Sequence, residues 1–339
     1  MNAAFYPHDR IQSIESLRHP LRFEPAELQR LAQRASRMYF VAKTTIKDDG
    51  TPRLLYDTRP PLKGVLQRIN EHFLRRVEYP DYLTGGLPGK DYKRSVDIHA
   101  GAATVIKEDI TKFYPSVTSE VVYDIWHRFF GFAHDVANLL TLLTTRDGHL
   151  EQGAPTSGYL ANLALWDVEP GLVERLNARG ISRYSRHVDD ITMSSEQRLD
   201  GQEAAWAVSQ VYGMLRQKSL QGKREKHKVM HSNSKITILK LVGNEKASLP
   251  TEERSRVRAL VHRFTKQVEA GENLDALIAE LPKVRGQAHK VKRFHPHKGA
   301  QLVASIDAAA QLLKALPVNA IDHGIDDQRW SEPCETPPW

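Results

Sequence analysis

Apolar residues recur close to every 3.6 positions along most of the chain, which is the period of an amphipathic helix. Leu28, Leu31, Ala35 and Met38 follow this period, so we expect residues 1–42 to be mainly helical. The same spacing predicts further helices over 62–77, 116–131, 156–180 and 201–218, and after Pro250 over 251–271, 272–284 and 298–316.

Shorter segments have the composition of strands. Residues 43–57 hold two such runs around Asp49-Gly50, a turn signal that predicts a β-hairpin. Residues 102–110 predict a strand that ends at an acidic residue, and 183–195 predict two strands that meet at Val188-Asp189-Asp190. A further strand is expected at 236–242. The pattern indicates an α+β body followed by a helical region from residue 250.

Length and composition indicate a globular protein. The chain has 339 residues, 40% of them hydrophobic and 26% charged, which fits two or three packed units. Its one cysteine, Cys334, excludes an intramolecular disulfide and a cysteine-based zinc site. The sequence has neither the long apolar stretch of a membrane helix nor the pattern of a secretory signal. We therefore expect a cytoplasmic protein without a membrane partner.

Basic charge is concentrated in two blocks. The formal net charge is +7, and residues 221–240 hold six Lys and Arg with one Glu, while 281–300 hold six with no acid. Such blocks favour a polyanionic partner such as nucleic acid. The fifteen histidines lack the helical spacing of a zinc site, and His289, His295 and His297 lie within the second basic block.

Acidic residues at strand ends carry the clearest chemical signal. Asp109 ends one predicted strand, and Asp189-Asp190 lie at the turn of a hairpin, with Gln152-Gly153-Ala154-Pro155 between them in the sequence. An acidic doublet alone is usually ordinary turn chemistry. Carboxylates that converge from two strands can instead hold two divalent ions about 3.5–4 Å apart, the arrangement used in phosphoryl transfer.

Five segments in order resemble the palm motifs of reverse transcriptases, most closely the bacterial retron type. They are KEDITKFYPSV, QGAPTSGYLANLAL, RYSRHVDDITMS, GKREKHKVMH and ITILKLVG. The resemblance covers about 43–245, and VRGQAHKVKRFHPHKG resembles the thumb of the same group. It implies a right-hand polymerase with fingers, an antiparallel palm sheet and a helical thumb. The expected divisions are an N-terminal helical region (1–42), fingers and palm (43–249), thumb (250–316) and an acidic, proline-rich tail (317–339).

The resemblance assigns the metal-binding groups residue by residue. Asp109 and Asp189 are the expected metal-binding carboxylates, Asp190 is a supporting acid, and the carbonyl of Ile110 is a further ligand. The implied cofactor is a pair of Mg²⁺ ions, with Mn²⁺ as a substitute.

Other positions match the nucleotide site of the family. Tyr114 matches the aromatic gate that excludes the ribose 2′-hydroxyl, and Gln152 matches a residue that contacts the incoming nucleotide. Lys47 and Arg53 resemble the basic pair that binds its triphosphate. Lys228 lies near the motif that can protonate pyrophosphate, and Lys226 competes with it for this role.

Primer and RNA contacts are implied at two further places. His187 stands where the family mostly has an aromatic residue beneath the primer terminus, and the thumb block supplies Lys290, Lys292 and Arg293. The retron elements Asn-Ala-x-x-His and Val-Thr-Gly are only partly kept here, at His99 and Gly243. This leaves open whether the chain is a true retron enzyme or belongs to a neighbouring defence-associated lineage.

The resemblance implies an RNA-directed DNA polymerase that uses deoxynucleotides, copies a dedicated noncoding RNA and holds an RNA–DNA product duplex. It further implies a role in antiphage defence with a separate effector protein, and leaves homo-oligomerisation open. Two alternatives remain at this level. One is a template-independent or protein-primed DNA polymerase of a defence system, and the other is a non-catalytic RNA-binding protein that uses only the basic blocks.

Overall fold

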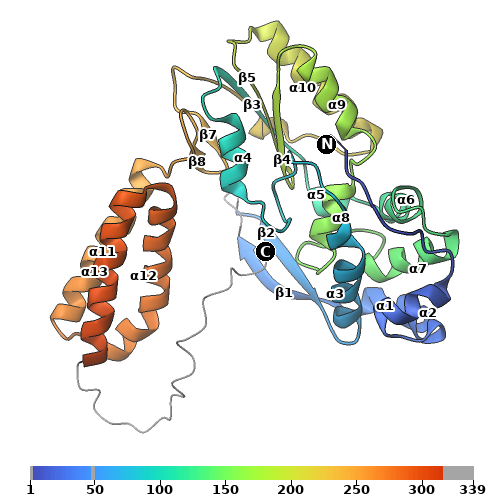
Figure 1. The fold of residues 1–339 in the computed structure, drawn as a ribbon, viewed down its shortest axis with the longest axis horizontal. Coiled ribbons are helices and arrows are strands. Elements are labelled where there is room, and N and C mark those ends of the chain that lie inside the picture. The colour runs from blue at the N-terminus through green and yellow to red at the C-terminus, as the bar shows by residue number, and fades with distance from the viewer. Residues whose placement is uncertain (1–2, 47–49, 316–339) are drawn as a thin grey trace. The chain divides into compact units, whose positions relative to one another are not determined.

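The computed structural model describes residues 3–46 and 50–315. The chain divides into two compact units, Met1–Leu239 and Lys240–Trp339, and each is described by itself (Figure 1). Among the described helices, none combines the length and apolar character needed to cross a membrane. Lys47 and the tail 317–339 lie outside the described residues.

The first unit begins with short helices and a β-hairpin. Its first helices are η1 (Ile14–Leu17), α1 (Arg18–Leu21), α2 (Pro25–Arg34) and η2 (Ala35–Met38). They are followed by the antiparallel pair β1 (Tyr39–Ile46) and β2 (Pro52–Thr58). The hairpin is the expected one, but β1 begins at Tyr39, inside the region 1–42 that we predicted to be helical. Tyr39 is buried and its hydroxyl donates a hydrogen bond to the Leu143 carbonyl, so tertiary packing overrides the helical period here.

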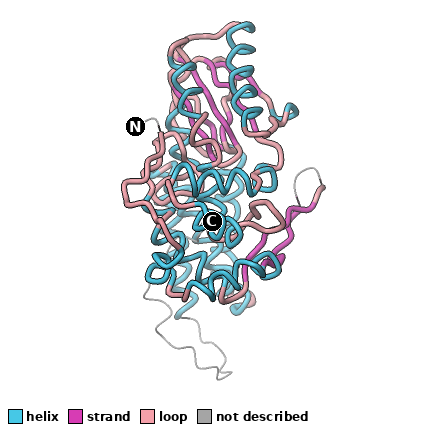
Figure 2. Tube along the Cα trace, turned by 90° about the vertical axis from the view of Figure 1, so that its right-hand side faces the viewer, coloured by secondary structure: helices cyan, strands magenta, loops and turns pink. Residues whose placement is uncertain are grey.

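A four-stranded antiparallel sheet forms the centre of this unit, with the strand order β4-β5-β3-β6. The strands are β3 (Thr104–Asp109), β4 (Arg183–His187), β5 (Asp190–Ser195) and β6 (Lys228–His231). Figure 2 shows the strands with helices beside them. The expected strands at 102–110 and 183–195 are confirmed, whereas β6 was not anticipated.

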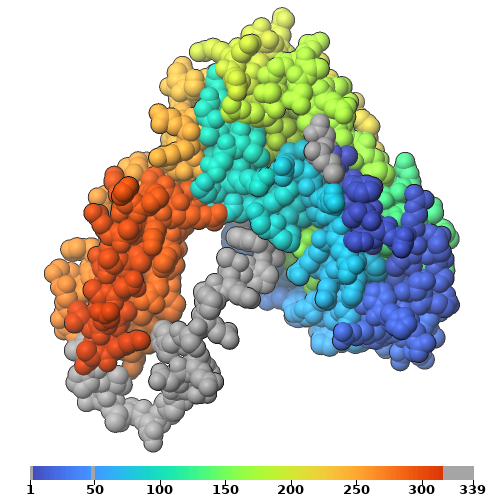
Figure 3. Space-filling view, in the orientation of Figure 1, coloured from blue at the N-terminus to red at the C-terminus, as the bar shows by residue number. Residues whose placement is uncertain are grey.

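Helices surround the sheet and complete the first unit. The helix α4 (Tyr92–His99) contacts β4, and α10 (Gly201–Gln217) contacts β3 and α9 (Glu169–Asn177). In the space-filling view, the green and yellow-green surface at the top belongs largely to α9 and α10 (Figure 3). The remaining elements are α3 (Leu62–His72), η3 (Leu74–Arg76), α5 (Phe113–Ser116), α6 (Ser119–Asp124), the π-helical turn η4 (Ile125–Phe129), α7 (His134–Thr144), α8 (Ser157–Leu163), η5 (Arg224–Lys226) and β7 (Thr237–Ile238).

Two predicted elements of the first unit are interrupted. The long helix expected over 156–180 is two helices, α8 and α9, because Pro170 has no N–H to donate and lies in the first turn of α9. The strand expected at 236–242 ends after Ile238, because Leu239 and Lys240 have φ of 48° and 65° and turn the chain.

The second unit contains the short strand β8 (Leu241–Val242) and three helices, α11 (Thr251–Glu269), α12 (Leu274–Phe294) and α13 (Pro296–Ala315). Its core is formed by apolar side chains of all three helices, including Phe264, Val284 and Ile306. The helix expected over 272–284 extends through Pro282 to Phe294, so the basic segment is helical. A Cβ on Gly299 would lie 2.1 Å from the Lys292 Cα, which shows how closely α12 and α13 approach.

Candidate active site

Three aspartates meet at one end of the palm sheet. Asp109 ends β3 and pairs in register with Asp190, the first residue of β5. Asp189 lies in the two-residue turn between β4 and β5, and its carbonyl accepts a hydrogen bond of 2.9 Å from the Ile110 amide. Asp109 is 4% exposed. The sequence pattern predicted these residues at strand ends, and the register of the sheet brings the strand ends together.

Burial and mutual repulsion dominate the electrostatics of this group. Burial raises the pKa of Asp189 to about 6, and the neighbouring charges of Asp190 and Asp109 contribute to this rise. Burial also raises the pKa of Asp190, although the Lys107 ammonium opposes the shift. The Asp109 charge thus lies close enough to disfavour the ionised forms of Asp189 and Asp190, in addition to the effect of their burial.

Two lysines supply positive charge beside the aspartates. Lys226 in η5 forms an ion pair with Asp109. Burial lowers the pKa of Lys226, but the hydrogen bond and charge of Asp109 outweigh it, so the pKa is raised. Lys107, two residues before Asp109 on the same strand face, has its pKa lowered by burial. Lys228, our predicted pyrophosphate donor, is exposed on β6 and pairs in register with Lys107.

The donor set suits a hard divalent cation. Carboxylate oxygens are the ligands that Mg²⁺ prefers, and two or three of them suffice when water and phosphate complete the shell. Among residues 3–46 and 50–315, no three His, Cys, Asp or Glu side chains already have the arrangement of a metal centre. Lys226 is paired with one carboxylate oxygen of Asp109, so an ion bound at this oxygen would compete with the ammonium.

Tyr114 lies next to the aspartates. It belongs to the short helix α5, which follows Lys112 at φ 44° and brings the chain back beside the sheet. The ring is partly buried, and burial raises the pKa of the phenol to about 12, with the Asp189 charge as the second cause. The structure thus brings Tyr114 close to Asp189.

Gln152 and Arg53 lie in elements that are in direct contact. The Gln152 carbonyl accepts a 2.7 Å hydrogen bond from the Tyr56 amide of β2. Gly153 has φ of 103°, and a Cβ there would lie 2.6 Å from the Tyr56 carbonyl oxygen. Arg53 is exposed three residues earlier on β2. The turn 152–155 is therefore fixed to the hairpin, although the predicted partner of Arg53, Lys47, lies outside the described residues.

His187 and His99 occupy different environments. His187 is the last residue of β4, and its Nδ1 lies 3.4 Å from the Thr84 hydroxyl. Burial lowers the pKa of His187. His99 is completely buried, where its two ring nitrogens lie 2.8 Å from the hydroxyls of Ser194 and Ser185, and burial lowers its pKa to about 3. His99 therefore ties α4 to the sheet and is not accessible to solvent.

The three predicted RNA-binding residues of the second unit differ in their surroundings. Lys290 forms a 2.6 Å ion pair with Glu253 of α11. Lys292 and Arg293 are exposed near the end of α12, and the Arg293 guanidinium lies 5.8 Å from the Phe294 ring centroid. Lys290 is thus partly neutralised within the unit, whereas Lys292 and Arg293 are accessible to solvent.

Sequence reasoning missed one residue of this group and left the choice between two others open. Lys107 alternates with Asp109 along a strand, so the period of two could have placed it on the same face. Lys226 and Lys228 remained competing candidates, because no local pattern shows which lysine of a basic segment reaches a residue more than a hundred positions earlier.

Comparisons with known proteins place the chain among retron enzymes. No family model matches it. It is 33% identical over 271 residues to the Retron Se72 reverse transcriptase of Salmonella heidelberg (strain 579083-10), and the aligned region covers 79% of this chain and 71% of the relative. It is 28% identical over 332 residues to the Retron Ec48 reverse transcriptase of Escherichia coli, covering 93% and 80%. For the Retron Mx65 reverse transcriptase of Myxococcus xanthus the identity is 27% over 309 residues, covering 85% and 69%.

Among solved structures, apo telomerase from Candida tropicalis matches with a TM-score of 0.41 and 10% identity, over 67% of this chain and 61% of that one. Telomerase from Candida albicans with a fragment of telomeric RNA matches with a TM-score of 0.37 and 10% identity, over 75% and 54%. The sequence relatives carry the assignment: this chain belongs to the retron reverse transcriptases and is an RNA-directed DNA polymerase.

Proposed function

We propose that Asp109, Asp189 and Asp190, with the Ile110 carbonyl, hold two Mg²⁺ ions and that the chain extends a primer along an RNA template. The observation that carries this is the register that sets Asp109 opposite Asp190, with Asp189 in the adjoining turn. Divalent ions at such a site activate the primer hydroxyl and offset the charge of the leaving pyrophosphate. The raised pKa of Asp189 supports the assignment, because it reflects a carboxylate that is buried and lies beside two other acids.

The nucleotide would lie between the aspartates and the hairpin. Tyr114 gates the sugar, Gln152 contacts the nucleotide, and Arg53 with Lys47 binds the triphosphate. For the proton donor to pyrophosphate we now favour Lys226 over Lys228, because Lys226 already reaches Asp109 and is freed when that carboxylate takes an ion. His187 supports the primer terminus from the end of β4.

We further propose a biological setting. The template is a dedicated noncoding RNA, the product is an RNA–DNA duplex, and the polymerase acts in the cytoplasm with a separate effector protein in antiphage defence. The support is membership of the retron family together with the two basic blocks. The flanking locus, expressed with the polymerase in a phage-challenged host, should reduce plaque formation. Equal protection by a variant that cannot polymerise would contradict the link between synthesis and defence.

Primer extension tests the catalytic assignment. With Mg²⁺, deoxynucleotides and an RNA template, the parent should extend a primer, and the double change Asp189→Ala with Asp190→Ala should reduce extension by at least about a thousandfold through loss of the ions. Asp97→Asn is the matched control, because Asp97 is an exposed acid on α4 whose bond is to Lys93. Parental extension by the double variant would refute the metal assignment.

A further inference from the structure

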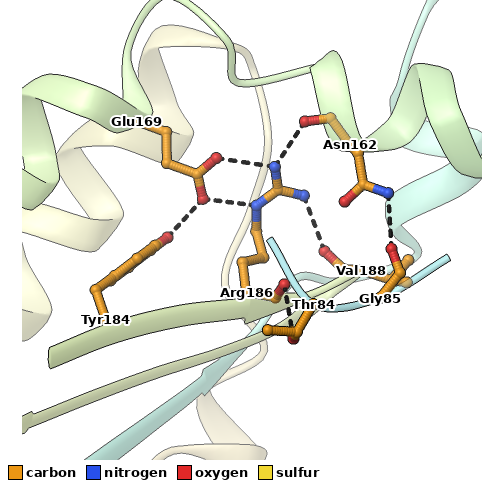
Figure 4. A network of polar contacts seen from close by, with 7 residues as sticks. All are labelled: Thr84, Gly85, Asn162, Glu169, Tyr184, Arg186 and Val188. Carbon is orange, nitrogen blue, oxygen red and sulfur yellow. Dashed lines mark hydrogen bonds and ion pairs between the residues drawn. The ribbon is translucent and has the colours of Figure 1, made fainter. Parts of the chain in front are cut away.

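An arginine and a glutamate form a completely buried ion pair next to the Val188-Asp189 turn between β4 and β5. Arg186 of β4 is 0% exposed and Glu169, the first residue of α9, is 1% exposed. The Arg186 Nε and Nη2 atoms donate to the two carboxylate oxygens of Glu169 at 2.6 and 2.8 Å (Figure 4). Tyr184 donates to the same carboxylate at 2.7 Å. Both carboxylate oxygens are thus satisfied inside the unit, as a buried charge requires.

The same guanidinium reaches the turn that carries Asp189. Its Nη1 donates to the Val188 carbonyl at 3.2 Å, and its Nη2 also donates to the Asn162 carbonyl at 2.8 Å. Figure 4 shows the Arg186 side chain between Glu169 on one side and Val188 on the other. A planar fork of donors can hold both partners at once, which a lysine ammonium on a flexible stem cannot do in the same geometry.

The turn itself needs support. Val188 has φ of 61°, a left-handed conformation that is unfavourable for a β-branched residue. It is also crowded, because a Cβ on Gly85 would lie 2.7 Å from the Val188 Cγ2 atom. Gly85 is held in place in turn, since its carbonyl accepts a 2.8 Å hydrogen bond from the Asn162 side chain. The turn conformation is therefore imposed by its surroundings.

Two hydrogen bonds fix the backbone on both sides of Asp189. The Val188 carbonyl belongs to the peptide unit before Asp189 and is held by Arg186. The Asp189 carbonyl belongs to the peptide unit after it and is held by the Ile110 amide at 2.9 Å. Fixing both peptide units fixes φ and ψ of Asp189 and hence the direction of its side chain toward Asp109.

We propose that Arg186 and Glu169 are positioning residues for catalysis, a buried clamp that holds the Val188-Asp189 turn so that Asp189 faces Asp109. The inference rests on the proposed function for its effect on catalysis, since Asp189 must bind an ion for its direction to matter. Arg186 and Glu169 are covered by other side chains and do not touch the nucleotide. Their effect is on the chemical step and not on nucleotide affinity.

Arg186→Lys tests the clamp, because it keeps the charge and removes the fork. The matched control is Arg183→Lys on the same strand, whose guanidinium bonds the Ala100 carbonyl and Glu196 instead of the turn. We expect kcat of Arg186→Lys to fall about 10- to 100-fold with the KM for deoxynucleotide within about twofold. The control should keep both constants within about twofold of the parent.

Amide hydrogen exchange at Ile110 is a second readout that needs no polymerase activity. Without the clamp the Val188-Asp189 turn should move, and the Ile110 amide should exchange at least about tenfold faster relative to amides in the middle of β3. Folded Arg186→Lys protein with parental kcat and parental Ile110 exchange would overturn the proposal. If the parent failed to extend primers, the proposed function would fall, while the exchange comparison would still decide the clamp.

The double change Arg186→Met with Glu169→Met covers the case in which the lysine variant does not fold. It removes both buried charges together and keeps an apolar volume, which buried ion pairs often tolerate. A folded double variant with reduced kcat and faster Ile110 exchange supports a positioning role. A folded double variant with the parental values of both would show that the pair serves the fold alone.

Discussion

Two of the three aspartates of the palm, Asp189 and Asp190, have a raised pKa, so their charges are costly before any cation binds. Lys226 pairs with Asp109 and Lys107 opposes the shift of Asp190, so two ammonium groups offset part of three carboxylates. Asp189 is left with the largest resolved shift among them, a pKa of about 6 against an ordinary value of 3.8. If Asp189 binds an ion, as proposed, its burial beside other carboxylates lowers the stability of the metal-free protein in exchange for that function.

Replacement of Asp189 by Asn should stabilise the protein in EDTA. The raised pKa means that the folded state holds its proton more tightly, so the penalty grows as pH rises from about 4 to about 6 and is complete above that. A shift of about two pKa units corresponds to at most about 3 kcal/mol. We expect Asp189→Asn to raise the free energy of unfolding by about 1–3 kcal/mol at pH 7.5 and by less at pH 5.

Denaturant unfolding of both proteins at the two pH values measures this difference. The Asn variant should be inactive in primer extension although it is more stable. Mg²⁺ should reduce the difference in the free energy of unfolding between the two proteins, because it stabilises only the parent. A variant less stable than the parent at pH 7.5 in EDTA would contradict the electrostatic description of the site.

Tyr114→Val should change the choice of sugar. The ring lies beside Asp189 and is partly buried, so its removal opens the volume that a ribose 2′-hydroxyl would need. We expect incorporation of ribonucleotides relative to deoxynucleotides to rise about tenfold or more, with a smaller fall in deoxynucleotide use. Single-nucleotide incorporation measures both, with Tyr114→Phe as the control that keeps the ring. An unchanged ratio in Tyr114→Val would mean that Tyr114 is a packing residue.

At the scale of elements, the turn 152–155 and the hairpin β1–β2 form one connected unit. The Tyr56 amide donates a backbone hydrogen bond to the Gln152 carbonyl. The Tyr56 ring also has a cation–π contact with the Arg146 guanidinium, which lies 4.8 Å from the ring centroid. Arg146 also pairs with Glu151 at 2.8 Å. These interactions hold the strand of Arg53 against the segment of Gln152, so the two predicted nucleotide-binding residues cannot move independently.

Gly153→Ala should break this connection. The new Cβ would meet the Tyr56 carbonyl at 2.6 Å, and φ of 103° is unfavourable for alanine. We expect the KM for deoxynucleotide to rise about tenfold as β2 is displaced. Gly180→Ala is the control, because it also has a positive φ, 77°, but no described atom lies within 4 Å of its Cβ. It should cost about 1 kcal/mol of stability and leave the KM unchanged.

A similar rise of KM in the two variants would assign the effect to backbone strain. A parental KM in Gly153→Ala would show that the hairpin and the turn do not act together on the nucleotide.

Much of this element structure could be predicted from local pattern. The Asp49-Gly50 signal marked the hairpin, and the β-branched and polar residues of 183–195 marked two strands around the doublet. The period of apolar residues does not show where a helix breaks, so the interruption between α8 and α9 at residues 164–168 was not predicted. The helix expected to stop at 284 instead continues to Phe294, because its apolar side chains beyond 284, Ala288, Val291 and Phe294, are buried against the neighbouring helices.

The candidate site could also be predicted only in part, because local patterns identify motif residues but do not identify their long-range partners. Motif order identified Asp109, Asp189 and Gln152, since each lies in a segment with its own signature. The long-range partners had no such signature. Examples are Lys226, which forms an ion pair with Asp109, and Glu169, which forms one with Arg186. The sequence alone does not distinguish a buried Arg or Glu from an exposed one; only the fold shows which side chains cover it.

At the scale of the whole molecule, the basic charge of the second unit has two kinds of surroundings. Lys290 is paired with Glu253, and Arg285 with Asp307 at 2.8 Å, so both are partly neutralised within the three-helix unit. Lys292 and Arg293 are exposed on the same helix. We therefore expect Lys292 and Arg293 to contribute more to the binding of a polyanion than Lys290 and Arg285 do.

The double change Lys292→Gln with Arg293→Gln should weaken binding of structured RNA. Removal of one phosphate-binding charge lowers the slope of log affinity against log salt by about 0.7–0.9, so removal of both predicts a fall of about 1.5 in the slope. Lys290→Gln is the matched comparison on the same helix, and its effect should be smaller because Glu253 already offsets its charge. Full-length protein titrated with an RNA hairpin at several salt concentrations gives both slopes. Parental affinity and slope in the double variant would exclude the end of α12 as an RNA-binding surface, whereas an equal reduction in Lys290→Gln would mean that RNA displaces Glu253 and binds the lysine.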